Sequence, residues 1–394
     1  MGWQDAQYPS KPGPAAFQVR DVNGQVELLS GTPPPYSASR GNMGRSQQQY
    51  QPWWQPKYWR KRTWAIVAAV IAIILVIIIV VPVEVVKANR YPNYSQLNYS
   101  LSDTYSGSTF FDNFNYFEGY DPAEGFVHYV PRETAESLNL TYASDSTAVL
   151  RVDTSVGNTS TPDASTGRFS VRVESKTQYE SGLFIFDVKH TPYGCGTWPA
   201  LWLVDAAHWP DNGEIDVMEA VNQATDGNQM TLHTTSGCTM SGVKRKMTGS
   251  ATQGTCNNNT NSNAGCGVLG DEDSYGAAYN DASGGVMALE WRDEGIRMWE
   301  FARSAIPADI TAQTPDPSTW GTATADFPDT ECNIGNHFRN QSIIVNIDLC
   351  GQWAGNVYAE SGCPSNCTDY VANYPDAFTN AYWEFGSFEV YTAS

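Results

Sequence analysis

The chain has 394 residues and a formal net charge of −19, and it is 41% hydrophobic and 12% aromatic. This hydrophobic content excludes a disordered chain and is ample for a large core. The charge is uneven, because residues 1–63 hold eight Lys and Arg against three Asp and Glu, whereas the rest is strongly acidic. An acidic body repels phosphate backbones, so we expect no nucleic-acid partner.

Residues 1–63 are predicted to be a disordered tail, because they are rich in proline and show no helical or strand periodicity. Residues 64–83 form an uncharged apolar run of 20 residues. As a helix this run is about 30 Å long, the hydrocarbon thickness of a bilayer. A buried core helix is seldom apolar on every face, and a cleaved signal peptide would start closer to the N-terminus. We therefore predict a single transmembrane helix whose partner is the lipid bilayer.

The flanks of this run predict its orientation. Four basic residues precede it closely, Lys57, Arg60, Lys61 and Arg62, whereas only Lys87 and Arg90 follow it closely. The positive-inside rule then places the N-terminal tail in the cytosol. All eight cysteines and all seven Asn-X-Ser/Thr sequons follow the run, as expected of a lumenal or extracellular domain with disulfides. The sequence predicts a single-pass type II membrane protein of the secretory pathway, plasma membrane or cell wall face.

Residues 84–104 contain two of the sequons and are predicted to be a glycosylated stalk. Residues 105–394 have neither an internal repeat nor a break in composition, and are predicted to be one domain. Their regular segments, such as 168–174, 296–301 and 382–391, alternate apolar and polar residues with period two between turn-rich loops. This pattern predicts an all-β sandwich. Eight cysteines leave the disulfide pairing open, and no second pair with a suitable histidine completes a zinc site.

Three carboxylates stand close together in the segment Glu214-Ile-Asp-Val-Met-Glu219. In a regular strand Glu214 and Asp216 share a face, but Glu219 would point to the other side. One extra residue, a β-bulge near Val217 and Met218, would bring Glu219 back to the acidic face. We predict this bulge.

Such a row of acids is costly for folding. Two like charges about 5 Å apart repel by about 3 kcal/mol, or about two pK units, so one group should hold a proton near neutral pH. Three solvated acids on an edge strand are the plain alternative, but Trp198, Trp202 and Trp209 lie just upstream and His233 follows on the next predicted strand. Glycosidic cleavage needs one protonated and one ionised carboxyl, and sugar rings stack on indole. A bent strand could bring the two glutamates to the short separation of retaining enzymes.

Four spaced motifs, GTWPALWL, NGEIDVMEAVN, TLHTT and NIDLCGQWAG, resemble a fungal endo-1,3(4)-β-glucanase of glycoside hydrolase family 16, the laminarinase and lichenase family. The resemblance covers residues 105–394 and implies a concanavalin-like jelly roll of two antiparallel sheets that hydrolyses β-1,3 or mixed β-1,3/1,4 glucan with retention. It implies Glu214 as nucleophile, Glu219 as general acid/base and Asp216 as their assistant. It further implies substrate contacts from Trp202, Trp209, Trp353, His233, Arg168 and His128. No cofactor is expected, and no Asp/Asn-rich loop indicates the structural calcium that some relatives bind.

Two other functions stay open at this point. A wall-remodelling transglycosylase shares the first half-reaction, and the sequence does not separate it from a hydrolase. A non-catalytic glucan-binding lectin on the same sandwich would have no need of all three acids. The chain has five histidines, no G-x-S-x-G elbow, no phosphate-cradling glycine motif and no H-E-x-x-H, so other hydrolase chemistries fit poorly.

Overall fold

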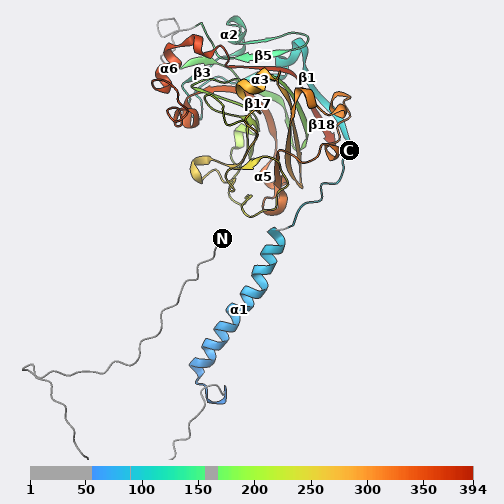
Figure 1. The fold of residues 1–394 in the computed structure, drawn as a ribbon, viewed down its shortest axis with the longest axis vertical. Helices are drawn as coiled ribbons and strands as arrows, with labels where there is room; N and C mark the ends of the chain where they lie inside the picture. The colour runs from blue at the N-terminus through green and yellow to red at the C-terminus, as the bar shows by residue number, and fades with distance from the viewer. Residues whose placement is uncertain (1–55, 89, 156–166, 394) are drawn as a thin grey trace, which may run out of the picture. The chain divides into compact units, whose positions relative to one another are not determined.

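The structure is a computed structural model that describes residues 56–88, 90–155 and 167–393 (Figure 1). The chain divides within its first long helix into two compact units, Met1–Val70 and Ile71–Ser394. The tail expected over residues 1–63 lies outside the described residues except for its last eight. Among these, Pro56–Tyr58 form a turn of 3-10 helix, and helix α1 begins at Lys61.

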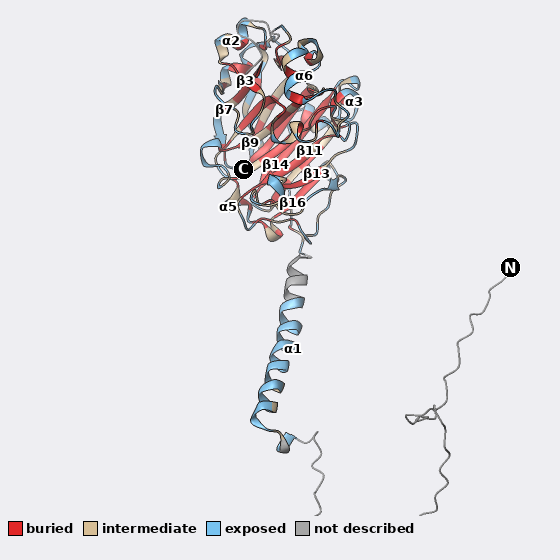
Figure 2. Cartoon of the chain, turned by 90° about the vertical axis from the view of Figure 1, so that its left-hand side faces the viewer, coloured by how far each residue is buried: buried red, intermediate tan, exposed pale blue. Residues whose placement is uncertain are grey.

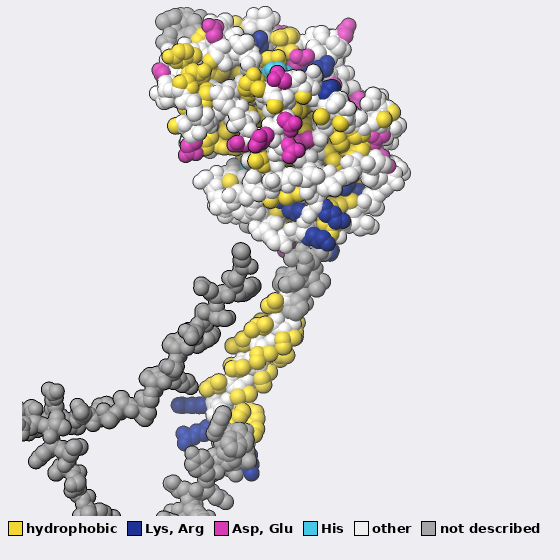
Figure 3. Space-filling model, in the orientation of Figure 1, with side chains coloured by type: hydrophobic (Ala, Val, Ile, Leu, Met, Phe, Trp, Pro, Cys, Tyr) yellow, Lys and Arg dark blue, Asp and Glu magenta, His cyan; other side chains and the backbone are white. Residues whose placement is uncertain are grey.

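Helix α1 runs over Lys61–Ala88. Its segment Lys61–Val81 is the one helix in the described part of the chain that is long and apolar enough to cross a bilayer, and none of it is buried (Figure 2). Figure 3 shows hydrophobic side chains along the helix and basic side chains gathered at its N-terminal end. An apolar run in hydrocarbon must satisfy its backbone internally, so a helix is the form it can take there. The helix begins three residues before the predicted run and continues beyond it.

Residues from Tyr99 onward form a sandwich of two eight-stranded sheets, each antiparallel throughout, and this confirms the predicted fold. The first sheet runs in the order β16 (Ala325–Pro328), β15 (Gly295–Ala302), β14 (Gly285–Arg292), β8 (Gly182–His190), β18 (Tyr382–Ala393), β5 (Ala148–Arg151) and β4 (Thr141–Ala143), with β1 (Tyr99–Ser106) also paired to β18. The second runs in the order β12 (Ser250–Ala251), β13 (Cys266–Leu269), β11 (Gln229–His233), β10 (Glu214–Glu219), β9 (Thr197–Val204), β17 (Gln341–Leu349), β7 (Arg172–Tyr179) and β2 (Phe114–Tyr116).

Smaller elements sit around the two sheets. Strands β3 (Val127–Tyr129) and β6 (Arg168–Ser170) form a parallel pair of their own. The short helices are α2 (Arg132–Ser137), α3 (Gly276–Asp281), α4 (Ala308–Thr311), α5 (Ile334–His337) and α6 (Cys367–Asn373). They lie in the connections between strands, so the sheets alone decide the architecture.

The main core lies between the sheets and is dominated by aromatic rings. Phe186 meets Phe388 edge to face with ring centroids 4.9 Å apart, and Phe110 lies 5.0 Å from Phe388. Burying one such side chain stabilises the fold by roughly 1.5–3 kcal/mol. Strand β8 is apolar on both faces, because Leu183 and Ile185 belong to a second, smaller cluster under residues such as Trp320. The alternation of apolar and polar residues that marks a strand with one solvated face is therefore absent from β8. Figure 2 shows the buried residues concentrated along the strands.

All eight cysteines form disulfides, which confirms the expectation from their even number. The pairs are Cys195–Cys363, Cys238–Cys332, Cys256–Cys266 and Cys350–Cys367. Two of the four hold the long segment after β17 against the start of β9 and the end of β17 itself. This segment carries Trp353, so the disulfides fix a wall of the site described below.

The folded domain starts earlier than residue 105. Strand β1 begins at Tyr99 and pairs with β18 along its length. Upstream, the hydroxyls of Tyr91 and Tyr94 each donate to Asp326 over 3.1 Å, and Arg90 forms a 2.9 Å ion pair with Asp329. Residues 90–104 thus belong to the domain rather than to the predicted stalk, because their tyrosines pack against its charged groups.

We expect a soluble domain that begins at residue 105 to be less stable than one that begins at residue 90. The shorter form lacks most of β1 and the two tyrosines bonded to Asp326. The unfolding midpoint should fall by about 5 °C or more, since 1 kcal/mol corresponds to roughly 2–4 °C in a large domain. Thermal unfolding followed by circular dichroism measures this, with Tyr94→Phe in the longer form removing one hydroxyl alone. Equal midpoints for the two forms would show that the segment is a stalk after all.

Candidate active site

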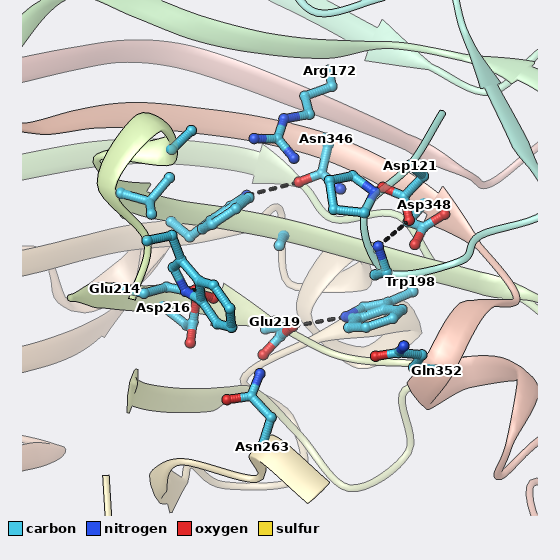
Figure 4. Close-up of a pocket in the computed structure, with 17 residues that line it drawn as sticks. Asp121, Arg172, Trp198, Glu214, Asp216, Glu219, Asn263, Asn346, Asp348 and Gln352 are labelled. Atoms are coloured by element: carbon cyan, nitrogen blue, oxygen red, sulfur yellow. Dashed lines mark hydrogen bonds between the residues drawn. The ribbon is translucent and has the colours of Figure 1, made fainter. Parts of the chain in front are cut away.

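Strand β10 carries the three acids in the middle of the second sheet. Its register with β9 pairs Asp216 with Trp202 and then Met218 with Leu201, so Val217 is an extra residue in the ladder. The predicted bulge is therefore confirmed. As a result Glu214, Asp216 and Glu219 all line one cavity of about 350 Å³ (Figure 4).

Each of the three carboxylates has its own partner. The indole Nε1 of Trp198 donates to Glu219 Oε1 over 2.7 Å, and that of Trp209 donates to Glu214 Oε2. Between them, Asp216 Oδ2 lies 3.2 Å from His233 Nε2 in an ion pair. The environments of the three acids therefore differ, because two carboxylates accept from neutral indoles and the third faces an imidazole whose pKa is raised.

The surroundings of Glu214, Glu219 and His233 raise the pKa of each of these groups. Burial, and next the charge of Asp216, raise the pKa of Glu214 to about 7 and that of Glu219 to about 8, against an ordinary 4.5. Burial opposes protonation of His233, but its contact with Asp216 and the charge of Glu214 outweigh burial and raise the pKa of His233 to about 10. Between these two pKa values Glu219 holds its proton while Glu214 is ionised. This is the protonation state that paired acid and nucleophile chemistry requires.

His233 has a polar neighbour at each of its two ring nitrogens. Glu214, Asp216 and His233 are the one group of potential ligands close enough together among the described residues. However, the Nδ1 atom of His233 lies 3.0 Å from the Asn263 side-chain oxygen while Nε2 faces Asp216. The protonated form of His233, which its raised pKa favours, carries an N–H on both of these nitrogens.

Aromatic and polar side chains from other strands complete the cavity. Trp202 donates to Asn346 Oδ1 over 2.8 Å, and the guanidinium of Arg172 lies 5.0 Å from the centre of the Trp202 ring. Trp209 is 41% exposed at the rim, as a platform for a sugar would be. The polar and aromatic lining residues that the sequence analysis did not predict as site residues are Asp121, Arg172, Trp198, Asn263, Asn346, Asp348 and Gln352.

Some of these omissions had a signal in the sequence. Asn346 and Asp348 alternate on β17 within the motif NIDLCGQWAG, so they share one face of the strand. Arg172 stands four residues after Arg168 in the motif GRFSVR. Asp121 lies in a loop with no pattern around it, and nothing in the sequence points to it.

Three of the predicted substrate contacts, Arg168, His128 and His233, do not line the cavity, and a fourth, Trp353, lines a neighbouring one. Arg168 is fully buried, and its guanidinium donates to the Val371 and Asp153 carbonyls over 2.8 and 3.1 Å. His128 is an exposed residue of β3 whose ring lies 5.2 Å from Phe169. Both belong to the small parallel pair β3–β6, which the sequence analysis did not anticipate.

A second cavity of about 490 Å³ lies on the other side of Glu219 and is lined by Trp353. The Trp353 ring stands edge to face against Trp198 at 6.0 Å. Glu219 lines both cavities, so the candidate acid stands between two spaces that could each hold a sugar.

Comparisons with known proteins agree with this geometry. A family model described as the XgeA-like catalytic GH16 domain matches residues 114–391. A probable glycosidase of Schizosaccharomyces pombe is 47% identical over 77% of this chain and 71% of its own length. An endo-1,3(4)-β-glucanase of Emericella nidulans is 40% identical over 75% of this chain, but the match spans only 47% of that relative.

Two solved structures resemble the domain closely. Laminarinase 16A of Phanerochaete chrysosporium, with β-glucans in donor and acceptor sites, has a TM-score of 0.71 at 44% identity. An elongating family 16 β-1,3-glucosyltransferase has a TM-score of 0.69 at 41% identity. Each match covers 75% of this chain and 100% of the solved one.

Proposed function

Because this chain belongs to glycoside hydrolase family 16, we propose that it is a membrane-anchored endo-β-glucanase that cleaves β-1,3 and mixed β-1,3/1,4 glucan with retention. The observation that carries the proposal is the bulged strand β10, which turns Glu214, Asp216 and Glu219 into one tryptophan-lined cavity. The endo-1,3(4)-β-glucanase among the relatives and the laminarinase with bound β-glucan support this substrate class.

In the proposed first step, the ionised carboxylate of Glu214 attacks the anomeric carbon and Glu219 gives its proton to the departing glycosidic oxygen. The bond to the leaving sugar breaks as the glycosyl–Glu214 ester forms. In the second step, Glu219 takes a proton from water, and the resulting hydroxide equivalent displaces Glu214. The raised pKa of Glu219 supports its role as the acid. The indole bond from Trp209 and the nearby charge of His233 favour the ionised form of Glu214.

Asp216 is proposed to assist from between the two glutamates. Its negative charge raises the pKa of both neighbours, which helps Glu219 to keep its proton. The 3.2 Å contact with His233 holds Asp216 in place. Trp202 and Trp209 are proposed to stack against the sugar on the Glu214 side, and Trp353 on the far side of Glu219.

A transglycosylase is the second candidate, because one similar solved structure is an elongating β-1,3-glucosyltransferase. The cavity beside Trp353 could bind an acceptor sugar that replaces water in the second step. A hydrolase and a transglycosylase require the same roles of Glu214 and Glu219. The two candidate functions differ only in whether water or a sugar attacks the glycosyl-enzyme.

We expect the soluble domain to shorten laminarin and lichenan and to leave cellulose intact, with β-configured products at first release. Chain lengths by chromatography and the anomer by proton NMR measure this outcome. Products longer than the input would favour the transglycosylase. Initial α-configured products would contradict the retaining mechanism, and intact laminarin and lichenan would contradict the glucanase.

Helix α1 is proposed to span a membrane with the catalytic domain on the lumenal or extracellular side. Lys61–Val81 has the length and apolar composition for one crossing. The excess of basic residues before the span supports a cytosolic N-terminus. The four disulfides fit an oxidising compartment.

Sealed microsomes that contain the full chain should protect residues 105–394 from added protease. Only the N-terminal tail should be lost, and the protected fragment should be digested once detergent opens the vesicles. Immunoblots against each end of the chain measure the two fragments. Digestion of the catalytic domain in sealed vesicles would reverse the proposed topology.

A further inference from the structure

Asn228 lies one residue before strand β11, is fully buried, and points its side-chain amide at the bulge in β10. The amide oxygen accepts the backbone N–H of Glu219 over 2.9 Å. The amide nitrogen donates to the Val217 carbonyl over 3.0 Å. One side chain therefore holds the backbone on both sides of Met218.

These two backbone groups lie beyond the part of β10 that pairs with β11. The pairing of β10 with β11 covers Glu214 to Asp216 and ends there. Beyond Asp216 the bulge takes the chain out of the ladder, and buried backbone groups left unpaired cost about 1–3 kcal/mol each. The Asn228 amide supplies one acceptor and one donor at the places where a neighbouring strand would otherwise provide them.

The orientation of the Asn228 amide is itself determined by its surroundings. Its second amide hydrogen goes to Glu300 Oε1 over 2.9 Å, from strand β15 of the opposite sheet. Its backbone N–H donates to Ser274 Oγ over 2.9 Å, and its carbonyl accepts from Gly270 over 2.8 Å. Exchange of the amide oxygen and nitrogen would set the nitrogen against the Glu219 N–H and the oxygen against the Val217 carbonyl, so one orientation is fixed.

We propose that Asn228 is a positioning residue that aims Glu219 into the cleft. This rests on the proposed function, in which Glu219 is the general acid/base. Asn228 holds the backbone of Glu219, and Trp198 holds its carboxyl group, so the acid is fixed at both ends. A one-residue shift in the register of a strand turns its side chains to the opposite face, and the clamp opposes such a shift at Glu219.

Two substitutions test the clamp. Asn228→Ala removes all three side-chain bonds. Asn228→Asp keeps the size and the acceptor for the Glu219 N–H, but it has no donor for Val217 and sets a carboxylate against Glu300. We expect kcat on laminari-oligosaccharides to fall about tenfold for Asn228→Asp and further for Asn228→Ala, with KM changed less than about threefold.

Comparing substrates with good and poor leaving groups distinguishes a positioning role of Asn228 from a general loss of structure in its variants. An aryl β-glucoside with a good leaving group needs little proton donation, so its first step should slow less than about threefold in both variants. Adding Glu300→Gln to Asn228→Asp restores a donor between the sheets and should recover part of the lost kcat. Glu300→Gln alone keeps an acceptor for Asn228 and should lower kcat by less than about threefold.

Asn280 offers a matched control, because its amide also accepts from a backbone N–H and donates to a backbone carbonyl, those of Thr191. Neither Asn280 nor Thr191 lines the cleft. Asn280→Ala should therefore lower the unfolding midpoint without a loss of kcat that depends on the leaving group. Equal losses on both substrates for the Asn228 variants, or no loss, would overturn the proposal. If Glu219→Ala shows leaving-group dependence and the Asn228 variants do not, this inference fails while the proposed function stands. If Glu219→Ala itself turns over natural glucan normally, the proposed function fails.

Discussion

Replacing Glu214 with glutamine should lower kcat on laminarin by about a thousandfold or more while the affinity for glucan stays within about threefold. Glutamine fills the same space and can still accept the indole hydrogen of Trp209, so the cavity keeps its shape. An uncharged amide cannot attack the anomeric carbon and leave again as a stable carboxylate. Initial rates measure the loss, and calorimetric titration with laminari-oligosaccharides measures the binding.

The nucleophile can also be identified directly. In a Glu219→Ala background, an activated glucoside should glycosylate Glu214 faster than water removes the sugar. Mass spectrometry of peptides should then find the added sugar on the segment that contains Glu214. The exposed Glu180 serves as a control, since Glu180→Gln removes a carboxylate that lines neither cavity of the site and should leave kcat unchanged. Turnover of Glu214→Gln within tenfold of the parent would remove Glu214 from the mechanism.

The bulge in β10 could be predicted from the sequence, because the spacing of its acids conflicts with the two-residue period of a regular strand. Glu214 and Asp216 are in phase, and Glu219 is out of phase by one residue. A single extra residue resolves the conflict, and the structure places it at Val217. The prediction worked because three acids on one short strand left few ways to bring them together.

Other parts of the site were beyond such reasoning. The parallel pair β3–β6 takes Arg168 and His128 away from the cleft, and no local pattern distinguishes it from an antiparallel hairpin. Asn228 stands between a glycine and a strand and would be read as a turn residue. Its role depends on a bulge in a different strand and on Glu300 in the opposite sheet, contacts that only the three-dimensional fold brings about.

The start of the domain was misjudged for a different reason. Residues 90–104 are rich in Tyr, Asn and Ser and contain two sequons, which is the composition of an exposed stalk. The tyrosines are nevertheless packed, because Tyr94 lies over the Arg297 guanidinium at 4.1 Å and bonds to Asp326. Tyrosine serves in both exposed and buried settings, so composition alone could not decide between them.

Replacing Glu219 with alanine should lower kcat on laminarin by about 10²–10⁴-fold, because the departing sugar oxygen then leaves without a proton. A substrate whose leaving group is a weak base should be glycosylated at nearly the parent rate. Azide should accelerate the second step, since it attacks the glycosyl-enzyme without needing a base, and the product should be the β-glycosyl azide. If azide has no effect and both substrates slow equally, Glu219 is not the acid/base.

The pH profile tests the same assignment independently. Glu219 acts as an acid only when protonated, so activity should fall as pH rises through its pKa, which burial raises to about 8. Glu214 acts only when ionised, so activity should fall as pH drops through its own raised pKa of about 7. In Glu219→Gln the alkaline limb should disappear with an activated substrate, while the acidic limb, which belongs to Glu214, should remain. An unchanged alkaline limb in that variant would assign it to another group and leave the raised pKa of Glu219 without a catalytic purpose.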